Sequence, residues 1–94
     1  MGLFTFGLPK PKTQLQEALY LLIKRGGMTR KDFFTETYIL NAPNLIMLLR
    51  RRGINIKTEE IARVNKYGRS ISYGYYVLQE RISAKDIYRK MHKK

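Results

Sequence analysis

The chain has 94 residues, of which 44% are hydrophobic and 12% aromatic. This is enough for one small domain with a modest core, and it excludes two full domains or a long disordered chain. The 19 Lys and Arg residues against 7 Asp and Glu residues give a formal net charge of +12, so a polyanion is the first partner to consider. With no Cys and a single His, His92, the sequence excludes disulfides, zinc modules and Cys or His nucleophile chemistry.

Residues 1–11 are expected to form an apolar N-terminal arm. Two prolines flank Lys10 and favour an extended chain there. Two interpretations stay open, because the aromatic side chains either cover the domain's own core or pack on a second subunit or a protein partner. The candidate interaction residues of the arm are Leu3, Phe4, Phe6 and Leu8.

The sequence also bears on location. The longest apolar stretch without tyrosine, residues 45–49, is far shorter than the roughly 18 residues needed to span a bilayer. The first residues lack the basic region and small-residue cleavage site of a signal peptide. We therefore expect a cytoplasmic protein with no membrane partner.

Helical signals follow the arm, and they predict three helices over residues 13–25, 30–36 and 43–52. Thr13 with Gln16 and Thr29 with Asp32 both have capping-box spacing. The pair Gly26-Gly27 ends the first helix, and Phe33 and Phe34 supply the apolar face of the second. In the third, Pro43 lies in the first turn with Asn41 as a capping candidate, and Gly53 follows the end.

After Gly53 the apolar period changes from near four to two, which predicts two strands of a hairpin. The outgoing strand starts at Ile54 and runs to Val64, with an irregularity expected at Glu59-Glu60 where the alternation slips; the return strand covers residues 70–77. The polar linker 65–69 contains Asn and Gly and suits a tight tip. A last helix is expected to start at a Ser83–Asp86 cap, with Ile87 and Met91 as its apolar residues.

This order of elements resembles the small winged helix-turn-helix domains of bacterial, phage and mobile-element proteins. The resembling residues are Gly26–Thr29, Leu49–Glu59 and Tyr76–Leu78. The resemblance implies a mainly α fold with three helices and a two-stranded wing over residues 12–79, followed by a basic C-terminal helix or tail over 80–94. It also implies that the 43–52 helix is the recognition element and that the 64–71 tip is the wing.

The cations near these two elements are the candidate DNA contacts. Helical spacing places Asn44, Met47 and Arg51 on one face of the 43–52 helix. Asn44 can read adenine and Arg51 a guanine or a phosphate, whereas Met47 offers no hydrogen bond to a base. Tyr67, at the tip, is available for stacking. The candidate DNA-binding residues are Asn44, Met47, Arg50, Arg51, Lys57, Arg63, Lys66, Tyr67 and Arg69.

Catalysis is the function that the sequence supports least. Glu59 and Glu60 point to opposite faces of a strand, and no nucleophile motif or phosphate-cradling Gly loop is present. Asp32 and Glu36 lie one turn apart, as two ligands of one cation would. Capping and solvation of their helix are the simpler explanation of both residues. We therefore expect no enzyme activity, no cofactor and no metal site.

The expected function is non-enzymatic double-stranded DNA binding, in a transcriptional or mobile-element regulator. About five phosphate contacts, from Arg50, Arg51, Lys57, Lys66 and Arg69, predict a log–log salt slope near −4 to −5. A specific complex needs a dimer or a second protein, for which the arm is the candidate joint. The alternatives are a winged-helix protein-interaction module that regulates or inhibits a nucleic-acid enzyme, and RNA binding.

Overall fold

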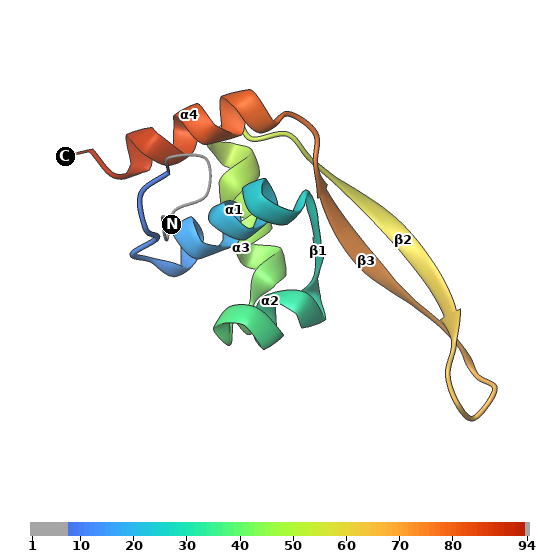
Figure 1. Cartoon of the computed structure of the whole chain (residues 1–94). Helices are drawn as coiled ribbons and strands as arrows, with labels where there is room; N and C mark the ends of the chain where they lie inside the picture. The colour runs from blue at the N-terminus through green and yellow to red at the C-terminus, as the bar shows by residue number, and fades with distance from the viewer. Residues whose placement is uncertain (1–7, 94) are drawn as a thin grey trace.

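The computed structural model describes residues 8–93, which form four helices and a three-stranded antiparallel sheet (Figure 1). The expected mainly helical arrangement with a hairpin and a C-terminal helix is confirmed. The strand order is β1-β3-β2, so that the first strand lies beside the last. The elements in chain order are α1 (Gln14–Arg25), β1 (Gly27–Thr29), α2 (Arg30–Thr37), α3 (Ala42–Arg51), β2 (Ile56–Val64), β3 (Ser70–Leu78) and α4 (Arg81–Met91).

Helix α1 begins with half of the predicted capping box. The Thr13 side chain accepts a hydrogen bond from the Gln16 N–H at 3.1 Å. The Gln16 side chain does not complete the box: its Oε1 accepts from the Lys12 N–H at 2.7 Å, and its Nε2 donates to the Met91 carbonyl at 3.2 Å. Gln16 therefore ties the start of α1 to the end of α4.

Helix α2 begins with the complete predicted capping box, in which Thr29 and Asp32 each accept the other's backbone N–H at 3.0 Å. Its two phenylalanines do not share one apolar face. Phe33 is fully buried whereas Phe34 is 44% exposed, because adjacent helical residues lie about 100° apart around the axis. The helix ends at Thr37, and the capping residue Tyr38 has a left-handed φ of 60°.

Strand β1 was not predicted, because three residues are too few to show an alternating pattern. It pairs with β3 from Gly27↔Val77 to Thr29↔Tyr75 and so joins the hairpin to the helices. The Tyr75 ring lies directly over Gly27, where an added Cβ would collide with it. A side chain at this position would therefore require the Tyr75 ring to move.

The hairpin pairs without interruption from Ile56↔Leu78 to Val64↔Ser70. The predicted irregularity at Glu59-Glu60 is therefore wrong. Beyond Ile56 no residue of β2 is buried, so no core requires an alternating pattern there. Ile54 is buried but precedes the strand, which begins at Ile56. The outer part of the hairpin, here called the ribbon, projects away from the helices (Figure 1).

Helix α4 begins at Arg81, so the predicted Ser83–Asp86 start is wrong. The Ser83 hydroxyl instead donates to the Glu80 carboxylate at 3.1 Å. The buried face carries Ala84 and Tyr88, while the predicted Ile87 and Met91 are only partly buried. The buried side of α4 is therefore centred on Ala84 and Tyr88, with Ile87 and Met91 packed at its border.

Tyr88 closes the core where α4 meets the start of the described chain. Its side chain is fully buried, its hydroxyl donates to the Pro9 carbonyl at 2.6 Å, and burial raises the pKa of Tyr88. Leu8 is also buried in this core, which removes it from the set of residues offered to a partner. Leu3, Phe4 and Phe6 lie outside the described residues.

Candidate nucleic-acid interface

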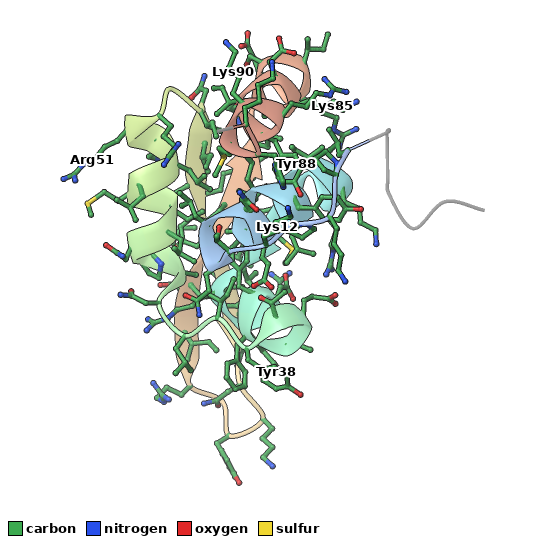
Figure 2. All side chains as sticks on the ribbon, turned by 90° about the vertical axis from the view of Figure 1, so that its left-hand side faces the viewer. Lys12, Tyr38, Arg51, Lys85, Tyr88 and Lys90 are labelled. Carbon is green, nitrogen blue, oxygen red and sulfur yellow. The ribbon has the colours of Figure 1, made fainter. Side chains whose placement is uncertain are left out.

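Helix α3 has one buried and one exposed face, as predicted. Ala42, Leu45, Ile46 and Leu49 are buried, and the opposite side presents Asn44, Met47 and Arg51 to solvent. Figure 2 shows Arg51 projecting from the body of the molecule. At the start of the helix Pro43 occupies the first turn, but the Asn41 side chain makes no capping hydrogen bond. The outer face of α3 is thus a free surface with one amide, one thioether and one guanidinium.

Arg50 is placed differently from the prediction. Its Nε and Nη2 donate to the Ile56 carbonyl at 3.0 and 2.8 Å, and Nη2 also donates to the Thr58 hydroxyl at 2.7 Å. These bonds use one side of the guanidinium to fasten the end of α3 to the start of β2. Arg50 therefore positions the hairpin, and these bonds leave only the other side of its guanidinium for a phosphate.

Replacing Arg50 by Ala is expected to lower the free energy of unfolding by about 1 kcal/mol, since its three hydrogen bonds to Ile56 and Thr58 are lost at an exposed position, where such bonds contribute little. For a domain of this size the melting temperature falls by about 4–8 °C. Calorimetry of R50A beside R51A, a matched control in which no such bond is lost, measures the difference. Equal melting temperatures for the two variants would contradict this role.

The strands of the ribbon carry no net charge. Lys57 and Arg63 are balanced by Glu59 and Glu60. The Lys57 Nζ lies 4.0 Å from a Glu59 carboxylate oxygen, and Arg63 Nη1 donates to the neighbouring Ala62 carbonyl at 2.9 Å. Exposed ion pairs of this kind contribute little to stability, so both cations can exchange partners. The middle of the ribbon nevertheless carries no net positive charge.

The tip of the ribbon is ordered by Asn65. Its side-chain oxygen accepts the N–H groups of Tyr67 and Arg69, both at 2.9 Å, and Gly68 takes the left-handed φ of 85° that the turn needs. Tyr67 is 82% exposed, and the Lys66 ammonium lies 5.3 Å from the centre of its ring. Two cations and one exposed aromatic ring therefore form a compact group at the tip.

The predicted contact residues form two groups rather than one continuous patch. The outer face of α3 ends near the start of β2, while the tip lies at the far end of the ribbon (Figure 1). A nine-residue strand spans roughly 30 Å at about 3.3 Å per residue. Other cations lie elsewhere, since Lys85 projects from the side opposite to Arg51 (Figure 2). The positive charge is thus spread over several faces.

An exposed aromatic and aliphatic cluster near the α2–α3 loop was not predicted. Phe34 packs edge-on against Tyr38 with ring centres 5.7 Å apart, and Tyr38 and Leu40 are 76% and 72% exposed. The four-residue spacing of Phe34 and Tyr38 was an available signal, but nothing in the sequence indicated that Tyr73 lies nearby. A groove of about 410 Å³ is lined by Arg30, Lys31, Phe34, Ile39, Leu40 and Tyr73.

The two acidic residues one turn apart on α2 both have structural contacts. Asp32 caps α2, and Glu36 lies 3.4 Å from the Arg25 guanidinium. Among residues 8–93 no three His, Asp or Glu side chains gather where they could hold a metal ion. Over the same range no helix is long and apolar enough to cross a membrane.

Comparison of the chain with protein-family models, with curated protein sequences and with solved structures finds no significant match. Function is therefore inferred from the residues and geometry described above.

Proposed function

We propose that this chain is a winged helix-turn-helix protein that binds double-stranded DNA, in the role of a small transcriptional or mobile-element regulator. The proposal rests on two features found together in this chain: α3 has an exposed outer face, and the tip of the ribbon is cationic. Three helices followed by a hairpin are the order of elements that the resemblance implies, and this order supports the proposal. The net charge of +12 favours a polyanionic partner.

The geometry suits a duplex. The exposed face of α3 fits the major groove, where Asn44 can bond adenine and Arg51 guanine or phosphate. The tip lies roughly 30 Å along the ribbon, close to the 34 Å repeat of B-DNA. Lys66 and Arg69 can therefore neutralise phosphates about one turn from the groove that holds α3, with Tyr67 against the sugar or base edges.

Salt dependence tests this proposal. With Arg50 engaged by β2, four of the five expected phosphate contacts remain: Arg51, Lys57, Lys66 and Arg69. The log of the affinity for a random duplex is then expected to fall with the log of salt concentration at a slope of about −3.6. Fluorescence anisotropy with labelled duplex DNA, structured RNA and single strands measures it.

The same titration has a clear control and a clear negative outcome. An unrelated basic domain of equal net charge serves as the reference for non-specific attraction. Stronger binding to structured RNA than to duplex moves the function to RNA. Affinity for every nucleic acid no better than the reference contradicts the proposal.

A second candidate function is supported by the groove beside α2. Its apolar and aromatic wall, formed by Phe34, Leu40 and Tyr73, has Arg30 and Lys31 beside it. Exposed aromatic residues of this kind are typical of protein-binding surfaces. A protein-interaction module using this groove is the alternative that a failed nucleic-acid titration would favour.

A further inference from the structure

Strand β2 has an outer edge that no other described strand covers from Thr58 to Val64; at its start the Ile56 carbonyl accepts from Arg50. It is the outer strand of the sheet order β1-β3-β2, and within residues 8–93 no other strand pairs with that side. It has nine residues, contains no proline and pairs with β3 without a bulge. An open, regular edge of this kind is a template for pairing with another strand.

The direction of the backbone groups follows from two hydrogen bonds of the hairpin. Asn65 N–H donates to the Arg69 carbonyl, and Gln79 N–H donates to the Asn55 carbonyl, both at 2.9 Å. In an antiparallel ladder alternate residues face the partner, so odd-numbered residues of β2 bond β3. The even-numbered residues Thr58, Glu60, Ala62 and Val64 therefore present their N–H and C=O groups outward.

The charged residues of β2 are of both signs, and their spacing lets two antiparallel copies of the strand place Glu opposite Arg. Glu59 lies two positions before Ile61 and Arg63 two positions after it, near the middle of β2. The strand is neutral as a whole, although the chain carries +12. Pairing of β2 with β2 of a second copy therefore brings no net charge of the two strands together.

We propose that the chain forms a two-fold symmetric dimer in which β2 pairs antiparallel with β2 of a second copy, centred on Ile61. In this register Glu59 faces Arg63 of the partner subunit, and Arg63 faces the partner subunit's Glu59. Thr58 and Val64 face each other across the seam, as do Glu60 and Ala62. The outward groups then form about eight new backbone hydrogen bonds, and the two sheets become one.

Neighbouring registers are less favourable. Centring the pair on Glu60 places the two Glu60 side chains together and sets Lys57 against Arg63 of the partner subunit. Centring it on Ala62 leaves no opposite charges facing each other. Since directly opposed like charges destabilise a sheet and opposite charges stabilise it, the charge pattern selects the register centred on Ile61.

The dimer is tested by exchanging the charges, in sedimentation runs over the micromolar range without nucleic acid. The wild-type chain is expected to sediment as a dimer. Glu59→Arg and Arg63→Glu should each raise the dimer dissociation constant at least about tenfold, since each places two like-charge pairs at the seam. An equimolar mixture of the two variants restores opposite charges at both pairs and should form a heterodimer as readily as the wild type.

A second measurement uses the absence of Cys from the chain. In the proposed register Ile61 faces itself at a pair without hydrogen bonds, with Cα atoms about 4.5 Å apart, a separation that a disulfide accepts. Ile61→Cys should therefore oxidise to a covalent dimer, whereas Lys66→Cys at the exposed tip should stay largely monomeric. Circular dichroism of each variant checks that the fold is kept.

Three results would overturn the dimer. They are a wild-type chain that stays monomeric throughout, a dimer that survives either charge reversal, and a variant mixture that does not associate. Because nucleic acid is absent from the assay, these outcomes do not depend on whether the chain binds DNA.

Discussion

Reversing the charge of Arg51 and Lys66 together is expected to weaken duplex binding about 100-fold or more. Each reversal removes a charge-assisted phosphate contact and adds a repulsive one. Both residues are exposed, so the melting temperature should change little. Anisotropy titration of the R51E/K66E variant at fixed salt, with a melting curve beside it, measures both effects.

The matched control for this variant makes the same change of net charge away from α3 and the tip. Lys12 and Lys90 lie elsewhere on the molecule (Figure 2), and K12E/K90E lowers the net charge equally. If the two double variants lose the same affinity, the binding depends on total charge and not on the proposed interface. If R51E/K66E keeps its affinity, the interface lies on another face, with α4 and its basic end the first to test.

Replacing Tyr88 by Ala is expected to cost about 3–5 kcal/mol of the free energy of unfolding. Truncating a large buried ring removes its contacts and leaves a cavity, and here the hydroxyl bond to the Pro9 carbonyl is lost as well. At about 4–8 °C per kcal/mol for a domain of this size, the melting temperature falls by at least about 12 °C. Differential scanning calorimetry measures the change.

Two further variants separate the ring from its hydroxyl. Tyr88→Phe keeps the ring and loses only the hydrogen bond to Pro9, at an expected cost of about 1–2 kcal/mol. Tyr67→Ala removes an exposed tyrosine and should cost less than about 0.5 kcal/mol. A Tyr88→Ala protein as stable as Tyr67→Ala would show that α4 does not complete the core.

Local signals in the sequence determined most of the helices and the hairpin. The Thr29–Asp32 box, Gly26, Gly53 and the 65–69 tip were all predictable, because caps and turns depend on a few adjacent residues. The two faces of α3 were predictable for the same reason, since helical periodicity alone separates Leu45 and Leu49 from Met47.

Contacts between distant segments were decided only by the tertiary structure. Strand β1 exists because β3 lies beside it, and the buried side of α4 is set by Tyr88, which packs into the core. Arg50 belongs to the hairpin because its guanidinium meets the Ile56 carbonyl. These positions depend on packing between separate elements or between residues far apart in the sequence. Short-range propensity does not encode such packing. The sequence thus specified a cationic domain with a free helix face and a basic tip, and the fold alone decided which cations stay available on each surface.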